Sequence, residues 1–329
     1  MTGTDVSAPS EPPAGTSPDG GGSPSGEAFP DGGGSAFAAQ LGALRADGER
    51  AGRYRVDVDA RWICPTVPHG GLMAALAARA MATELAVPDQ RLRSLTAVFA
   101  APVPAGPVTV DVEVLRRGRS MSQAKATVHG EGATSGHTTL AVFGGPRAGF
   151  AFTDPTMPAV PPPSDCPSFR DEPPDGEGPV TVPFWDQVEG RPAMGHAPWD
   201  DYVPDRSDCA TWYRFDQPPR GADGALDPLA LVTLCDTMPA SVEERMGPGQ
   251  PDWWGPSTDL TVHLLGESRA EWVLAAMRAH RAGDGYASVE VMLWDPDVGL
   301  VAYGTQVMFF TFPGGPPPPE QRVPTDQRG

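Results

Sequence analysis

The sequence of 329 residues predicts an α+β protein in which one arrangement occurs twice. Residues 69–145 and 226–312 each begin with one apolar helix and continue with several strands that alternate between apolar and polar residues. A helix that is apolar nearly all round has to be enclosed by other elements. We therefore expect each set of strands to wrap its own helix as an antiparallel sheet.

The first repeat is predicted from its helix and from the strands that follow. His69-Gly70-Gly71 opens a helix filled with alanine and large apolar residues, which ends near Leu85, just before Pro88. The next segments alternate with a period of two, and Gly118 supplies a hairpin turn. The strands are expected at Leu92–Ala101, Val108–Leu115, Ser122–His129 and Gly136–Phe143.

The second repeat has the same order of elements. Its helix is expected from Asp227 or Pro228 to Met246, where Gly247-Pro248 stops it. The strands are expected at Ser257–Leu265, Glu271–His280, Ala287–Trp294 and Leu300–Phe310. Residues 52–63, 182–190 and 209–215 are expected to add an opening strand to each half.

Composition divides the chain further. We expect an N-terminal domain over 37–150 and a C-terminal domain over 181–312, joined by a Pro-rich acidic linker over 151–180. Residues 1–36 and 313–329 lack aliphatic runs and are expected to be disordered tails.

Charge, too, is unevenly distributed. The formal net charge is −18, but residues 37–150 carry a net charge of +4 and residues 181–312 carry −12. This balance argues against nucleic-acid binding. The arginines of the first half, including Arg91 and Arg93, leave room for a small anionic ligand, although exposed arginines also simply keep a sheet soluble.

Several classes of protein and cofactor are not indicated. The N-terminus lacks a signal peptide and no stretch of about 18 apolar residues predicts a membrane span, so we expect a cytoplasmic protein. Four cysteines far apart predict neither a disulfide framework nor a zinc site. Without a G-x-G-x-x-G, a P-loop, a G-x-S-x-G elbow or clustered histidines, we expect no cofactor and no metal.

Asp236 is the most unusual residue in the pattern, because it lies in the middle of the apolar second helix. A buried carboxylate is costly unless it is paired or used. It serves either a site or a plain hydrogen bond to a neighbouring strand. Pro239 leaves the carbonyl of Cys235 without its helical donor, an irregularity that suits both interpretations.

One apolar helix held by an antiparallel sheet is the hot-dog arrangement, and two copies on one chain form a double hot dog. With this pattern, the chain resembles the acyl-CoA thioesterase II (TesB-like) family over roughly residues 50–312. The motifs that carry the resemblance are His69-Gly70-Gly71, Arg117-Gly118-Arg119-Ser120-Met121-Ser122, Cys235-Asp236, Ser257-Thr258-Asp259 and Gly299-Leu300-Val301-Ala302-Tyr303-Gly304-Thr305-Gln306.

The resemblance implies a catalytic water held by Asp236, Ser257 and Gln306. Asp236 would act as general base on that water. Ser257 stands where the family usually has Thr, and Thr258 is its rival, because adjacent strand residues face opposite ways. Oxyanion donors are expected from the Gln306 amide or from N–H groups at a helix start.

Other residues are expected to contact the substrate. These are His69, Gly70, Gly71 and Thr258, and the two glycines would let the backbone approach the substrate closely. For His69, an ordinary place at the helix start is the alternative to a role as base.

The function expected from the resemblance is hydrolysis of an acyl-CoA thioester to a free acid and CoA. The alternative is a non-catalytic acyl-CoA or lipid-binding double hot dog. Hydration of an enoyl-CoA on the same fold uses a closely spaced Asp and His, which this sequence lacks. Exposed sheet edges and faces, together with the family analogy, predict a homo-oligomer.

Overall fold

The structure is a computed structural model that describes residues 34–171 and 182–318. Most of both predicted tails, and residues 172–180 of the predicted linker, lie outside the described residues. Ser35 accepts a hydrogen bond from the backbone N–H of Ala38 and caps the first helix. The helices are α1 (Ala36–Gly42), α2 (Gly70–Leu85), α3 (Pro228–Leu234) and α4 (Ala240–Met246), with short 3₁₀ turns η1 (Ala60–Trp62), η2 (Pro163–Asp165), η3 (Pro183–Asp186) and η4 (Cys235–Thr237).

All strands join one antiparallel sheet. They are β1 (Arg45–Ala46), β2 (Arg53–Val58), β3 (Arg91–Phe99), β4 (Gly106–Arg116), β5 (Met121–Gly130), β6 (His137–Gly144), β7 (Val188–Met194), β8 (Asp208–Phe215), β9 (Asp259–Leu264), β10 (Val273–Gly283), β11 (Tyr286–Asp295) and β12 (Gly299–Phe309). The predicted strands are thus confirmed within a few residues at each end. β2 falls within 52–63, β7 overlaps 182–190, and β8 covers 209–215.

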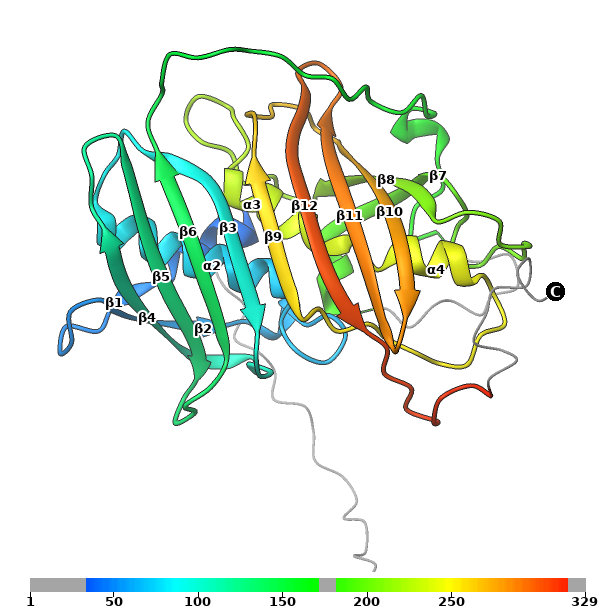
Figure 1. Ribbon diagram of the computed structural model, residues 1–329, viewed down its shortest axis with the longest axis horizontal. Coiled ribbons are helices and arrows are strands. Elements are labelled where there is room, and N and C mark those ends of the chain that lie inside the picture. Colours follow the sequence, from blue (N-terminus) through cyan, green and yellow to red (C-terminus); the bar gives the residue numbers. More distant parts are fainter. Residues whose placement is uncertain (1–33, 172–181, 319–329) are drawn as a thin grey trace, which may run out of the picture. The chain divides into compact units, whose positions relative to one another are not determined.

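The order of the strands shows that the two repeats are related by a pseudo-twofold. It reads β1-β2-β4-β5-β6-β3 and then β9-β12-β11-β10-β8-β7, so the second repeat mirrors the first about the β3–β9 pair (Figure 1). At this seam Leu95 pairs with Val262, and the hydroxyls of Thr96 and Thr261 lie 3.0 Å apart. The α+β double hot dog is confirmed, with both repeats sharing a single sheet.

Helix α2 is enclosed, as its composition predicts. The side chains of Leu72, Met73, Leu76 and Met81 are fully buried, and alanines fill the space between them. Strands β3, β4, β5 and β6 of its own repeat contact this helix. The helix ends at Ala86, which takes the left-handed conformation.

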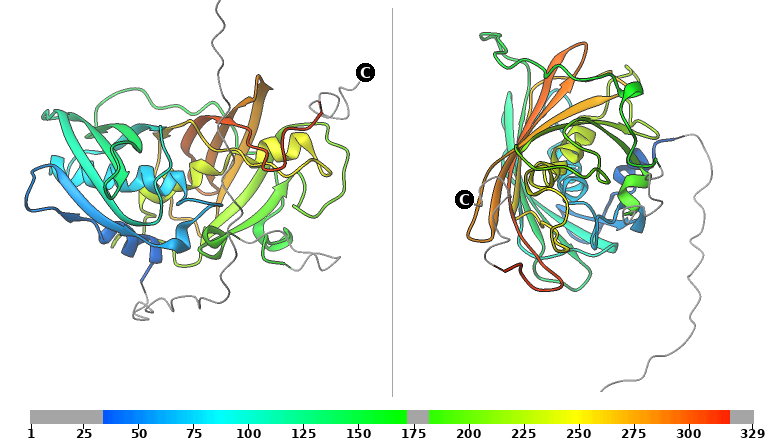
Figure 2. Two further views of the ribbon diagram at one scale, coloured as in Figure 1. Left: turned by 90° about the horizontal axis from the view of Figure 1, so that it is seen from below. Right: turned by 90° about the vertical axis from the view of Figure 1, so that its right-hand side faces the viewer.

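Helices α2 and α3 pack against each other in antiparallel fashion on the side of the sheet that curves around them (Figure 2). Gly71, at the start of α2, lies beside Thr233, at the end of α3; a Cβ on Gly71 would lie 2.8 Å from the Cα of Thr233. At the other end of the pair, Arg79 Nη2 lies 2.6 Å from Asp227 Oδ2.

The second helix is not continuous, which corrects the predicted helix from Asp227 or Pro228 to Met246. It divides into α3, η4 and α4, and Asp236 has non-helical dihedrals of φ −92° and ψ 37°. Pro239 has no N–H to donate to the carbonyl of Cys235, so the helical ladder is interrupted here. The break turns the Asp236 side chain toward the start of α2.

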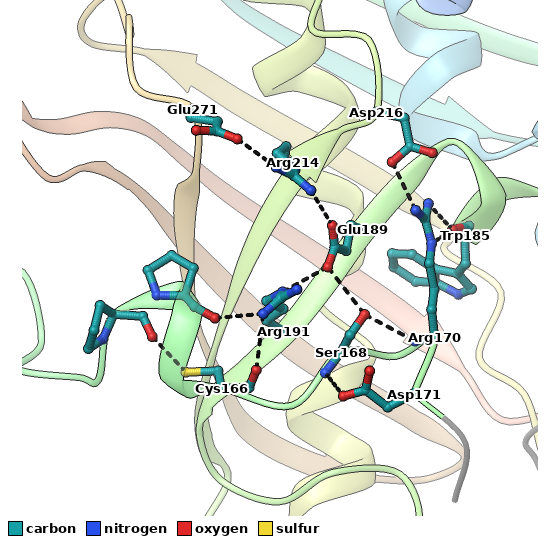
Figure 3. A network of polar contacts seen from close by, with 12 residues as sticks. Cys166, Ser168, Arg170, Asp171, Trp185, Glu189, Arg191, Arg214, Asp216 and Glu271 are labelled. Carbon is teal, nitrogen blue, oxygen red and sulfur yellow. Dashed lines mark hydrogen bonds and ion pairs between the residues drawn. The ribbon is translucent and has the colours of Figure 1, made fainter.

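Residues 157–171 of the predicted linker pack against the sheet, whereas residues 151–156 are exposed. Cys166 and Trp212 belong to a small apolar cluster on the second repeat, and Trp212 Nε1 donates to the Pro161 carbonyl at 2.9 Å. Glu189 fastens the same segment, because it binds Arg191 and Arg214 at 2.7 and 2.6 Å and accepts from the Ser168 hydroxyl (Figure 3). We call residues 157–171 the strap.

Candidate active site

Asp236 lies at the seam between the repeats, with only 7% of its side chain exposed. Its Oδ2 accepts a hydrogen bond of 2.8 Å from the backbone N–H of Gly71. Its Oδ1 accepts one of 3.2 Å from the Ser257 hydroxyl. Each carboxylate oxygen can accept a further bond, so the acid retains acceptor capacity for a water.

Two glycines make this approach possible. A Cβ on Gly70 would lie 2.7 Å from Asp236 Oδ2 and 3.0 Å from the Phe99 ring, and one on Gly71 would lie 2.9 Å from Asp236 Cβ. A larger side chain at either position would therefore push Asp236 away from the start of α2. The glycines were predicted to let backbone approach a substrate; in the structure, the group that approaches is Asp236.

His69 precedes the two glycines and lies beside the acid. Its Nδ1 is 3.8 Å from Asp236 Oδ2, too long for a hydrogen bond, and has no hydrogen-bond partner among the described residues. The imidazole stacks on Phe184, with ring centroids 4.1 Å apart and an interplanar angle of 5°. The contact fixes the plane of the ring.

Ser257 and Thr258, the two rivals, face different partners. Ser257 turns toward Asp236, as favoured from the sequence. The Thr258 hydroxyl lies 2.9 Å from the Val307 carbonyl and 3.1 Å from Asp259 Oδ1. The structure therefore brings Ser257 to the acid and leaves Thr258 outside this group, although Thr258 had been expected to contact substrate.

Gln306 is on the inner face of β12 and is 2% exposed. It shares this face with Gly304 and Met308. A Cβ added to Gly304 would lie 3.2 Å from Cys235 Cβ, and the backbone of Met308 forms an isolated antiparallel β-bridge with that of Ser257. Neither Oε1 nor Nε2 of Gln306 has a partner among the described residues. Because buried amides are nearly always hydrogen-bonded, this side chain is available to a ligand.

Burial dominates the protonation of the site. Desolvation raises the pKa of Asp236, opposed by His69, the Gly71 N–H and the Ser257 hydroxyl. Desolvation also lowers the pKa of His69, and the nearby Asp236 acts against it. Burial, followed by the charge of Asp236, raises the pKa of the Cys64 thiol to about 12, so this thiol stays protonated at neutral pH.

Sequence reasoning missed two aromatic walls of this site. Phe99 was placed within a predicted strand, which the structure confirms. Phe184 was placed within the expected opening strand 182–190, but the structure puts it in η3, and β7 begins only at Val188. Neither has a local signal, because a phenylalanine at a strand end is equally typical of ordinary core packing.

Within residues 34–171 and 182–318, no group of three His, Cys, Asp or Glu side chains is placed to hold a metal ion. No helix in these same ranges is long and apolar enough to cross a membrane.

Comparison with known proteins agrees with this fold. Residues 58–149 match the family model of the acyl-CoA thioesterase N-terminal domain, and residues 163–310 match that of the C-terminal domain. No curated protein matches the sequence.

Solved structures share the arrangement. A hot dog fold protein of unknown function from Alicyclobacillus acidocaldarius is 26% identical, with a TM-score of 0.69 over 84% of this chain and 98% of that one. The acyl-CoA thioesterase II TesB2 of Mycobacterium marinum is 22% identical, with a TM-score of 0.66 over 85% of this chain and 100% of that one. A putative thioesterase II from Thermobifida fusca YX is 22% identical, with a TM-score of 0.66 over 84% and 98%. With both halves matched in order, the chain belongs to the acyl-CoA thioesterase family.

Proposed function

We propose that the protein hydrolyses an acyl-CoA thioester to a free carboxylic acid and CoA. The observation that carries the proposal is a buried carboxylate, Asp236, that accepts a hydrogen bond from the Ser257 hydroxyl. The Gln306 amide on β12 is also buried and bonds to neither of them, so it is free for a ligand. Family membership supports the same chemistry. A thioester needs no covalent intermediate when a water is oriented and its proton is accepted.

Asp236 is the proposed base. Its raised pKa strengthens it as an acceptor for the proton of the attacking water, and positioned proton transfer contributes about 10²–10⁴-fold to a rate. Ser257 fixes the carboxylate through Oδ1 and leaves a hydroxyl oxygen that can accept from the water.

Gln306 is the proposed donor to the developing oxyanion. The alternative donor, the backbone N–H of Gly71, is already bonded to Asp236 Oδ2 at 2.8 Å. The Gln306 Nε2 is buried and has no partner among the described residues, so it can donate without losing an existing bond. In this proposal the water adds to the thioester carbon, Asp236 takes its proton, and the C–S bond breaks to release CoA, whose thiolate recovers the proton.

A second candidate function rests on the same contacts. Both oxygens of Asp236 have donors within the protein, so the acid also serves as a cap that joins the repeats. If joining the repeats were the only role of Asp236, the protein would bind acyl-CoA without cleaving it. The predicted homo-oligomer and cytoplasmic location remain predictions.

The test measures thiol release from acyl-CoA substrates of increasing chain length by the full-length protein. Replacing Asp236→Asn keeps one acceptor oxygen for the Gly71 N–H but removes the base, so we expect hydrolysis to fall by about 10²–10⁴-fold. The matched control is D284N, in the turn between β10 and β11, where the residue has a positive φ that Asn tolerates.

The outcomes separate the two functions. Turnover by the wild type that is lost in D236N and kept in D284N supports hydrolysis. Saturable binding of acyl-CoA by the wild type without any thiol release supports the binding protein and overturns the proposal.

A further inference from the structure

The two ends of the α2–α3 pair are pseudo-symmetric, and they differ in chemistry. His69 occupies the N-cap position of α2, and Asp227 occupies the N-cap position of α3. Asp236 lies nine residues after Asp227, and the position nine residues after His69 is Ala78. At the second end the acid is therefore replaced by alanine, and the neighbouring Arg79 pairs with Asp227 across the seam.

The second end is hollow. A cleft of about 720 Å³ opens there between the repeats, bounded by the second half of α2, the starts of β3 and α3, and the end of β9. Its apolar wall includes Ala78, Ala82, Leu92, Phe143, Leu229 and Leu264. This volume lies within the range of about 300–1,000 Å³ for small-molecule sites.

The rim of the cleft carries unbalanced positive charge. Arg79 is paired with Asp227, and Arg91 with Glu267. Asp223, the third acid of the lining, is paired with Arg269.

Two arginines of the lining remain without a carboxylate in the described part of the chain. Arg93 Nε donates to the Gly144 carbonyl at 3.0 Å, and Arg220 donates to the carbonyls of Gly224, Arg269 and Ala270. Backbone carbonyls hold these guanidinium groups in place without neutralising their charge, and guanidinium groups are well suited to carboxylates and phosphates.

Buried polar atoms of the lining also lack partners. Arg79 Nε and Gln90 Oε1 are both inaccessible to solvent and have no hydrogen bond to any described residue. Such atoms are uncommon in folded proteins unless a water or ligand meets them. Arg79 lies on α2, and Gln90 lies directly before β3.

From these features we propose that the cleft is a second, non-hydrolytic binding site for an acyl chain with an anionic head group. The apolar wall receives the chain, and Arg93 and Arg220 bind its carboxylate or phosphate. With Ala78 in place of the acid, this end has no counterpart of Asp236, and the three carboxylates of the lining are paired with arginines. The site goes beyond the proposed hydrolysis at Asp236 and does not depend on it, because it is defined by binding alone.

The test measures binding to the full-length protein by equilibrium dialysis and calorimetry. The probes are dodecanoate, S-dodecyl-CoA (a thioether that cannot be hydrolysed) and CoA itself. The R93Q/R220Q variant removes the two unbalanced charges, and A82W fills the cleft from a partly exposed helix position. The matched control is R206Q/R281Q, two exposed arginines outside the cleft.

We expect R93Q/R220Q to weaken probe binding at least roughly tenfold, since it removes charge-assisted hydrogen bonds. A82W is expected to remove one bound molecule per chain, while the control matches the wild type. Preference for dodecanoate identifies a fatty acid as ligand, and preference for S-dodecyl-CoA identifies an acyl-CoA. Absence of binding by both acyl probes, or binding unchanged in both cleft variants, would overturn the proposal.

Failure of this site and failure of the proposed hydrolysis give different results. Thiol release that is absent from wild type while the cleft variants still weaken binding contradicts only the hydrolysis. Normal thiol release with unaltered probe binding in both cleft variants contradicts only the second site. Thermal unfolding of both variants shows whether a loss of binding reflects a loss of fold.

Discussion

The backbone N–H of Gly71 donates to Asp236 Oδ2 at 2.8 Å, so an acid of the second repeat caps the helix of the first. A helix start carries partial positive charge and favours an anion. This contact offsets part of the desolvation that raises the pKa of Asp236. The Asp236 carboxylate thus both joins the two repeats and serves as the proposed base. Changes to Gly71 or to Asp236 should therefore affect both the stability of the protein and the rate of hydrolysis.

Replacing Gly71→Ala should destabilise the protein and lower its activity. The added Cβ would lie 2.8 Å from Thr233 Cα and 2.8 Å from the Thr233 carbonyl oxygen. Both atoms belong to the backbone and cannot rotate away, so we expect a loss of about 1–3 kcal/mol in the free energy of unfolding. Urea unfolding and thiol release measure the two effects.

The control for Gly71 is Gly42, at the end of α1, where an added Cβ would have no atom within 4 Å apart from those of its own helix and chain neighbours. Alanine there should leave activity unchanged and add stability, because alanine is favoured over glycine in a helix by roughly 0.5–1 kcal/mol. Equal stability and activity in G71A and wild type would contradict the close contact between α2 and α3.

The pH dependence of hydrolysis should report the protonation of Asp236. The ionised carboxylate is the base, so activity should fall as pH is lowered through its pKa, and burial places that pKa above the ordinary 3.8. The Ser257 hydroxyl stabilises the charged form. Replacing Ser257→Ala should therefore move the midpoint of the pH–rate profile to higher pH.

Thr258 supplies the comparison for Ser257. Its hydroxyl lies next to Asp259 and the Val307 carbonyl rather than Asp236. T258A should therefore keep the wild-type midpoint. A midpoint at or below the ordinary aspartate value, or the same shift in both variants, would remove Asp236 from the role of base.

Most of the fold follows from local patterns in the sequence, and the parts that do not follow are long-range. The alternation along Val108–Leu115 predicts β4, because a strand buried on one face alternates between apolar and polar residues. The apolar run after Gly71 predicts α2, because a helix that is apolar all round has to be enclosed by other elements. The pairing of β3 with β9 leaves no such pattern in the sequence. Thr96 and Thr261 fit any strand, and the choice of partner depends on distant residues.

The candidate site divides along the same line. Asp236 is conspicuous because a charge in an apolar helix is rare, and Ser257 follows from the resemblance. The break of the helix at Asp236 depends on a bond to Gly71, 165 residues away, in addition to Pro239. The stacking of His69 on Phe184 depends on how a segment after the strap returns to the first repeat, which composition does not encode.

Removing the charge of Glu189 should loosen the strap. Glu189 is 6% exposed and binds both Arg191 and Arg214, which together lower its pKa although burial acts in the opposite direction. E189Q leaves both guanidinium groups without this anion, and we expect a loss of about 2 kcal/mol. Hydrogen exchange should quicken in the strap around Cys166, Ser168 and Arg170, which Figure 3 shows beside this network.

The matched control for Glu189 is Glu113, whose pair with Lys125 spans 2.7 Å but whose side chain is 60% exposed. Exposed pairs contribute about 0–1 kcal/mol, so E113Q should change little. Exchange in the strap that is identical in E189Q and E113Q would show that the charge of Glu189 does not hold the strap.

His137 should make the protein less stable in mild acid. Burial lowers its pKa from 6.5 to about 4, with the Ala101 backbone acting in the opposite direction. Its ring makes an edge-to-face contact with Phe99, with the ring centroids 4.9 Å apart. Between these two pH values the unfolded chain binds a proton that the folded chain does not, so stability falls as pH decreases. The full shift corresponds to roughly 3 kcal/mol.

The comparison of wild type with H137Q isolates this contribution from the other buried histidine, His69, whose pKa burial also lowers. Urea unfolding at pH 7, 6, 5 and 4.5 gives the free energy of unfolding of each protein. The wild-type value should decline more steeply than that of H137Q over this range, because glutamine does not titrate. Parallel curves would mean that His137 is protonated as readily in the folded protein as in the unfolded chain, and that the packing of its ring against Phe99 does not exclude the charged form.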